Sequence, residues 1–67
     1  MSVARIVEIS ATSPKSFEDA IQQGLVRAGK TLRHIRGAWV KEQHVRCEDG
    51  RITEYRVNMM VTFVLDD

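Results

Sequence analysis

The chain has almost no cysteine or proline and few aromatic residues. Cys47 is its single cysteine and Pro14 its single proline. Its aromatic residues are one tryptophan, one tyrosine and two phenylalanines. One cysteine excludes an internal disulfide. His34 and His44 have no second cysteine with which to complete a zinc set. The sequence therefore provides for neither of the two cross-links that most often stabilise a short chain, an internal disulfide and a structural zinc.

The chain also lacks an excess of either charge and any long apolar run. Ten basic against nine acidic residues give a formal net charge of +1, which predicts no strong attraction to nucleic acid or to anionic membranes. No apolar run approaches the roughly 18 residues of a membrane span. The first five residues lack the apolar core of a signal peptide. We therefore expect a protein of the reduced cytoplasm.

The first half of the chain predicts a strand followed by one amphipathic helix. Residues 3–10 are rich in β-branched side chains and read as a strand, with a turn at residues 11–14. The helix begins either with Ser13 as its cap and Pro14 at its first position, or with Ser16 as its cap. It is expected to run to about Arg33. Its apolar positions step by three and four, and they are Phe17, Ala20, Ile21, Gly24, Leu25, Ala28 and Leu32.

Glycine costs about 1 kcal/mol against alanine inside a helix. Because Gly24 lies on the apolar stripe of this helix, we expect the helix to approach a sheet closely at that point.

The second half predicts a β-hairpin. A strand is expected over residues 36–47, a turn over residues 48–51 in which Gly50 supplies a positive φ, and a strand over residues 52–65. On strict alternation, neither face of the first of these strands is cleanly apolar. The last strand has one almost wholly apolar face, which we place under the helix: Thr53, Tyr55, Val57, Met59, Val61, Phe63 and Leu65.

The expected fold class is α+β, a β-α-β-β chain forming one domain over residues 1–67 with a three-stranded antiparallel sheet around one helix. One helix shields only one face of such a sheet. On the other face Trp39, Val45, Met60 and Val64 would be partly exposed, and a chain of this length buries little surface of its own. We therefore expect a closed symmetric assembly to be the functional unit.

Five segments of the chain together resemble the dodecins, and the resemblance covers almost the whole sequence. The segments are EISATSPKSFEDAI (8–21), AGKTLRHI (28–35), VKEQ (40–43), EYRV (54–57) and VTFVL (61–65). Dodecins are small β-α-β-β proteins that assemble as hollow shells of twelve subunits. Many bind riboflavin, FMN or lumichrome at subunit interfaces, for storage and quenching rather than catalysis. The resemblance therefore implies a homododecamer that binds a flavin.

The resemblance implies binding residues at three positions, Gly37, Trp39 and Arg56, and it includes two departures from the family pattern. The tryptophan that stacks on the flavin in typical members aligns with Gly37, and this chain has Trp39 two residues later, on the same face of a strand. Arg56 aligns with a glutamine whose amide meets the ring edge. Arginine donates to carbonyl oxygens but has no acceptor for the ring N–H, and it suits a phosphate or carboxylate. His44 is the fourth candidate, for a ligand phosphate.

Each candidate also has a structural interpretation. Trp39 is as well suited to an interface or core as to a flavin, and a lone strand histidine such as His44 is more often a surface group. Arg56 is expected to pair with a carboxylate such as Glu42 or Glu54. The spacing of the acidic residues fits no calcium loop, so no metal site is predicted.

No catalytic constellation appears in the sequence: there is no Ser/His/Asp set and no phosphate-binding glycine loop. The sequence therefore predicts a binding protein rather than an enzyme, with riboflavin or FMN as its cofactor. The alternatives are a dodecin-like shell that holds another small anion or a metal ion, and a shell with a purely structural role.

Overall fold

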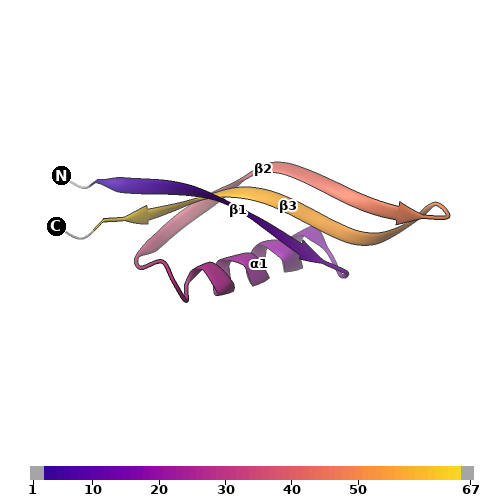
Figure 1. The fold of residues 1–67 in the computed structure, drawn as a ribbon, viewed down its shortest axis with the longest axis horizontal. Coiled ribbons are helices and arrows are strands. Elements are labelled where there is room, and N and C mark those ends of the chain that lie inside the picture. Colours follow the sequence, from indigo (N-terminus) through magenta and orange to yellow (C-terminus); the bar gives the residue numbers. More distant parts are fainter. Residues whose placement is uncertain (1–2, 66–67) are drawn as a thin grey trace.

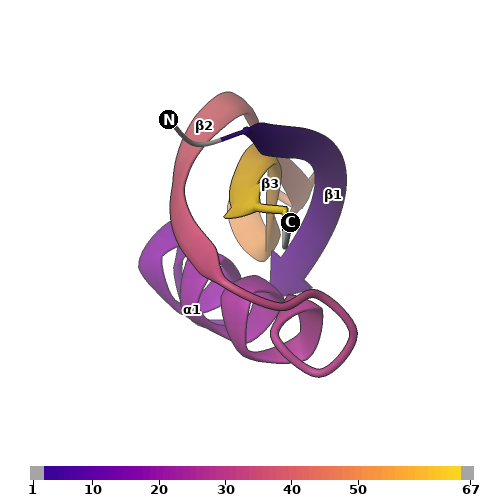
Figure 2. The same cartoon turned by 90° about the vertical axis from the view of Figure 1, so that its left-hand side faces the viewer.

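The computed structural model describes residues 3–65, which form one three-stranded sheet with one helix on its face (Figure 1). The elements are β1 (Ala4–Ser13), α1 (Phe17–Ala28), β2 (Ile35–Glu48) and β3 (Arg51–Val64). Both β1 and β2 pair antiparallel with β3, so the strand order is β1-β3-β2. Figure 2 shows β3 between its two neighbours, with α1 beneath the sheet. The expected β-α-β-β order and antiparallel sheet are confirmed.

β1 extends beyond its expected end because β3 offers it partners along its whole length. The strand was expected over residues 3–10, whereas its pairing with β3 runs from Ala4 opposite Val64 to Ser13 opposite Tyr55. Placing a turn at residues 11–14 was therefore wrong. The strand ends just before Pro14, which has no N–H to continue a ladder.

The second of the two expected helix starts is the correct one. Ser16 is the cap, and its hydroxyl oxygen accepts a hydrogen bond from the Asp19 N–H at 2.9 Å. Ser13 is instead buried at the end of β1. Its hydroxyl donates to the Asp19 carboxylate at 2.6 Å and accepts from the Lys15 N–H at 2.9 Å, which ties β1 to the first turn of α1.

The helix is shorter than expected. It ends at Ala28 rather than near Arg33, with Gly29 as its cap. The N–H groups of Thr31 and Leu32 both donate to the Ala28 carbonyl, at 3.1 and 2.9 Å, so the chain beyond the cap forms turns rather than further helix.

The core lies between α1 and the middle of β3, as the alternation of β3 predicts. Val57, Met59 and Val61 are fully buried there. Gly24 permits the close approach, because a Cβ at that position would stand 2.5 Å from the Met59 Cε atom and 3.0 Å from the Ala11 Cβ atom. A 12-residue helix is only about 18 Å long, so it covers the middle of the sheet and leaves the ends open.

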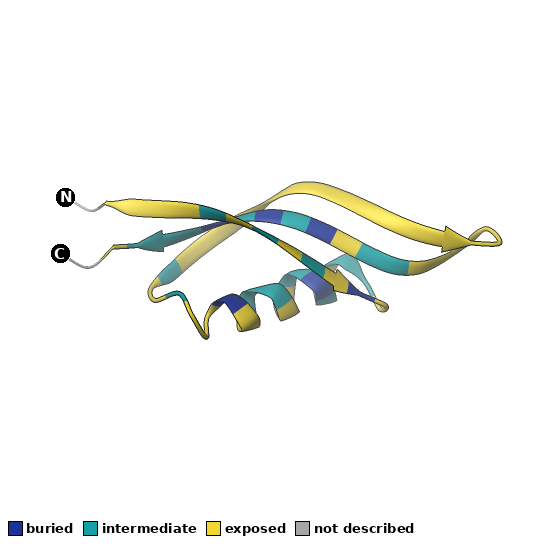
Figure 3. Cartoon of the chain, in the orientation of Figure 1, coloured by how far each residue is buried: buried dark blue, intermediate teal, exposed yellow. Residues whose placement is uncertain are grey.

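α1 does not cover β2. Every residue of β2 except Ile35 is exposed, whereas β3 alternates between buried and half-buried positions from Val57 to Thr62 (Figure 3). Among the exposed apolar side chains are Trp39 at 50%, Val40 at 37% and Val45 at 44% exposure. The single chain is thus an elongated body of 52 × 19 × 13 Å with one strand uncovered on both faces.

The β2–β3 hairpin turns through two residues with positive φ, Asp49 at 51° and Gly50 at 76°. This is the pattern of a type I′ turn. The positive φ expected at Gly50 is confirmed, and the positive φ at Asp49 was not expected.

Within the described range, no helix has the length and apolar character needed to cross a membrane.

Candidate ligand-binding face

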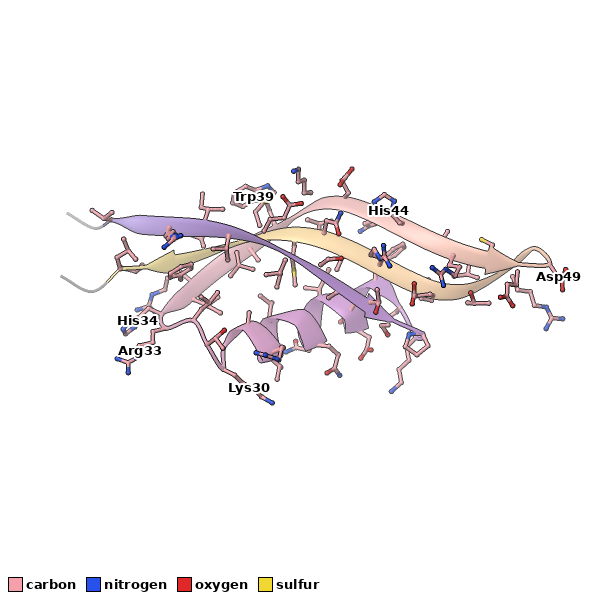
Figure 4. All side chains as sticks on the ribbon, in the orientation of Figure 1. Lys30, Arg33, His34, Trp39, His44 and Asp49 are labelled. Carbon is pink, nitrogen blue, oxygen red and sulfur yellow. The ribbon has the colours of Figure 1, made fainter. Side chains whose placement is uncertain are left out.

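The four residues expected to bind a ligand all lie on the face of the sheet turned away from α1. Trp39 and His44 stand on this side in Figure 4. We call it the open face. Because side chains directly opposite one another share a face, the strand pairing defines four cross-strand rows on it: Ile6–Thr62–Gly37, Glu8–Met60–Trp39, Ser10–Asn58–Glu42 and Thr12–Arg56–His44.

Trp39 presents the largest aromatic surface on the open face. Its side chain is half exposed, and it pairs across the sheet with Met60. The β2 position of the neighbouring row is Gly37, which has no side chain. No atom would lie within 4 Å of a Cβ added there, so the space beside Trp39 is open. An accessible indole with free space beside it suits the stacking of a flat ligand.

A β-bulge at Lys41 brings His44 onto the same face as Trp39. Val40 lies opposite Met59 and Glu42 opposite Asn58, so Lys41 is an extra residue in β2. Strict alternation would place Trp39 and His44 on opposite faces, because their numbers differ by five. The expected division of this strand into two faces was therefore wrong beyond Val40.

Lys41 reaches across the sheet to Glu8. Its Nζ atom lies 3.2 Å from the Glu8 Oε1 atom. The two residues belong to β2 and β1, the outer strands of the sheet, so the ion pair passes over β3 in the row of Met60. It places one ammonium and one carboxylate at the β1 end of the row that contains Trp39.

The far end of the open face is polar and hollowed. His44 and Arg56 lie directly opposite each other there, and the side chains around them line a cavity of about 310 Å³. Arg56 is 4.0 Å from the Glu54 carboxylate, which confirms one of its two expected ion-pair partners. The other, Glu42, instead accepts a hydrogen bond from the Asn58 amide at 3.1 Å. The end is rich in cationic and hydrogen-bonding groups suited to an anion.

The four expected site residues thus fall into two groups. Gly37 and Trp39 lie in adjacent rows at one end, and His44 and Arg56 share a row at the other. Met60 lies four positions after Arg56 on β3, which is roughly 13 Å along a strand. The open face therefore combines an aromatic surface with a distant cationic end.

Three further residues belong to the aromatic end and were not identified from sequence as ligand contacts: Glu8, Lys41 and Met60. Glu8 carried a signal, as the one acidic residue of a strand rich in β-branched side chains. Lys41 carried none, because only its place at the bulge directs it toward β1.

A second cavity of about 490 Å³ lies on the other face, between β1 and α1. Its lining includes Val7 and Ile9 from β1 and Gly24 and Leu32 from the helical side. None of the four expected site residues borders it.

Residues 3–66 match the family model for dodecin. The chain belongs to the dodecin family. The dodecin of Thermus thermophilus is 40% identical over 65 residues, which cover 97% of this chain and 94% of that protein. The calcium dodecin of Mycobacterium tuberculosis is 39% identical over 64 residues, covering 94% of this chain and 89% of its own.

Solved dodecin structures share the whole fold. A structure of dodecin from Streptomyces davaonensis has a TM-score of 0.93 at 35% identity and covers 98% of this chain and 97% of its own. The calcium dodecin structure from Mycobacterium tuberculosis superposes with a TM-score of 0.82 at 35% identity, covering 97% and 93% of the two chains. The expected family and fold are thereby confirmed.

Proposed function

We propose that this dodecin binds and stores riboflavin or FMN as a homododecamer in the cytoplasm, and that it is not an enzyme. The observation that carries the proposal is the half-exposed indole of Trp39 on the open face, with free space beside it at Gly37. An isoalloxazine stacked on an indole gains aromatic contact. Electron transfer from the indole would also quench its excited state, which limits unwanted photochemistry.

The cationic end of the open face supports FMN over riboflavin. His44, Arg46 and Arg56 all border its cavity. The separation of roughly 13 Å from the row of Trp39 suits a ribityl chain that carries its phosphate away from the ring. A phosphate at that end would meet charge-assisted donors.

The exposure of β2 supports assembly. A strand that is uncovered on both faces and at one edge is an aggregation hazard for a monomer. Val40 and Val45 on its helix-side face remain accessible in the single chain. A closed shell would bury such surfaces, and the resemblance to dodecins suggests twelve subunits.

A fluorescence titration of riboflavin and of FMN with purified protein tests the proposal, with the particle mass measured by light scattering on the same sample. We expect strong quenching at a fixed stoichiometry on a particle of about twelve subunits. Undiminished fluorescence at micromolar protein would refute flavin binding. A monomeric mass would refute the assembly.

Changing Trp39 to alanine separates a flavin platform from an interface residue. Stacking on an aromatic side chain contributes about 1–3 kcal/mol per base in nucleic-acid complexes, so we expect flavin affinity to fall roughly 5- to 150-fold while the particle mass stays unchanged. Dissociation of the particle in Trp39→Ala would instead assign the indole to subunit packing. Val26→Ala is a control, since Val26 is a similarly exposed apolar residue on α1.

Calcium is the second candidate, because one relative is named calcium dodecin. Between residues 3 and 65, no three His, Cys, Asp or Glu side chains gather in a group that could hold a metal ion. A calcium site would therefore have to draw on other ligands, such as backbone carbonyls, amide oxygens, water or groups of a neighbouring subunit. Calorimetric titration with Ca²⁺ tests this candidate directly.

A further inference from the structure

The Glu8–Lys41 ion pair holds hydrogen-bonding capacity that the fold does not use. A carboxylate has about four acceptor sites and an ammonium three donors, and one contact of 3.2 Å joins them. Their side chains are 43% and 52% exposed. An ion pair as exposed as this one contributes little to the stability of the fold. The remaining acceptor and donor sites are accessible from the open face.

The position of the pair relative to Trp39 is fixed by the strand register. Glu8, Met60 and Trp39 form one row across the sheet. Adjacent strands lie about 4.8 Å apart, so the two outer members of a row are about 10 Å apart at their backbones. A flat three-ring ligand stacked on the indole and directed along the row would bring its end to Glu8 and Lys41.

We propose that the Glu8–Lys41 pair recognises the imide edge of a planar ligand stacked on Trp39. The inference rests on the proposed function and names the groups that select the ligand. The imide edge of a flavin has one N–H between two carbonyl oxygens. The Glu8 carboxylate accepts from this N–H, and the Lys41 ammonium donates to an adjacent carbonyl. The ligand class is a planar heteroaromatic ring system with such an edge.

This assignment supplies the acceptor that Arg56 lacks. A glutamine amide offers one donor group and one acceptor, whereas a guanidinium has donors only. Arg56 also lies roughly 13 Å along β3 from the row of Trp39. Glu8 lies in the row of Trp39 itself, and the Lys41 ammonium meets it there through their ion pair, so the two offer both an acceptor and a donor. The move of the tryptophan from position 37 to position 39 brings the stacking surface into the row of Glu8.

Methylation of the ligand tests the proposal without altering the protein. We would measure the affinity of the assembled protein for riboflavin and for 3-methylriboflavin, which lacks the imide N–H. We expect methylation to weaken binding about tenfold, the effect of losing one hydrogen bond to a charged group. In the variant Glu8→Ala, the two ligands should bind with nearly equal affinity, because the acceptor is gone.

Two further variants complete the test. Glu54→Ala removes a different carboxylate from the open face and should retain the full effect of methylation. If Glu8→Ala does not assemble, Glu8→Met keeps the length of the side chain without an acceptor and takes its place. Lys41→Met should lower the affinity for riboflavin and for 3-methylriboflavin by the same factor, because both ligands lose the donor to their carbonyl oxygen.

The outcomes distinguish this inference from the proposed function. Equal binding of riboflavin and 3-methylriboflavin by the unaltered protein would overturn the inference and leave flavin binding standing. An effect of methylation that persists in Glu8→Ala would also overturn it. Failure of the unaltered protein to bind riboflavin would overturn both.

Discussion

Replacing Gly24 by alanine tests the contact between α1 and the sheet that positions the open face. Two effects oppose each other. Alanine is favoured over glycine inside a helix by about 1 kcal/mol, but its Cβ atom would lie 2.5 Å from the Met59 Cε atom and 3.0 Å from the Ala11 Cβ atom. The Met59 side chain is flexible yet fully buried, and the Ala11 Cβ atom moves only with the backbone of β1.

The clash should outweigh the gain in helix propensity. Overpacking of a well-filled core typically costs about 1–3 kcal/mol. Set against the gain of about 1 kcal/mol in helix propensity, the net expectation for Gly24→Ala is a loss of up to about 2 kcal/mol in the free energy of unfolding. Chemical denaturation followed by circular dichroism measures it. All variants must be compared at one protein concentration, because assembly makes the apparent stability depend on concentration.

Gly29 provides the matched control. It caps the same helix with φ −63°, and an added Cβ atom would meet its nearest neighbour, the Leu25 carbonyl oxygen, at 3.4 Å. Gly29→Ala should therefore be neutral or stabilise the protein by up to about 1 kcal/mol, through reduced freedom of the unfolded chain. If Gly24→Ala were as stable as Gly29→Ala, the close approach of α1 to Met59 would be refuted.

Two predictions concern the open face and use the same fluorescence titration. Arg56→Gln should reduce the affinity for FMN relative to riboflavin several-fold, because a charge-assisted donor to the phosphate is lost; an unchanged ratio would contradict a phosphate at that end. Gly37→Trp adds a second indole at a position where an added Cβ atom would meet no atom within 4 Å, and it should raise riboflavin affinity about fivefold or more. A lower affinity in Gly37→Trp would show that the ligand itself needs that space.

The helix and β3 could be predicted from sequence because a single packing surface determines their patterns. The apolar positions of α1 and the alternation of β3 both reflect burial against each other, and Val57, Met59 and Val61 are buried as expected. The ends were less predictable. Pairing with β3 carried β1 through to Ser13, and the cap at Gly29 stopped a pattern that continues to Leu32.

The faces of β2 could not be predicted, because no burial in the single chain constrains them. Every residue after Ile35 in this strand is exposed, so its sequence carries no clean alternation. The extra residue at Lys41 has no turn-forming or glycine signal either. The four expected site residues could be proposed from sequence because each has a chemically distinctive side chain or a place in the family pattern. Glu8 and Lys41 could be recognised as candidate ligand contacts only from the structure, through the 3.2 Å ion pair between their side chains.

The bulge at Lys41 separates two kinds of surface on β2. With the bulge, Val40 and Val45 share the helix-side face, and the charged residues that follow it share the open face with Trp39. Without it, Glu42 and His44 would lie among the apolar residues that we expect a second copy to cover, and an unpaired charge buried there is costly. One inserted residue thus keeps an apolar surface on the side where we expect assembly and leaves the polar and aromatic groups together on the side where we propose that a ligand binds.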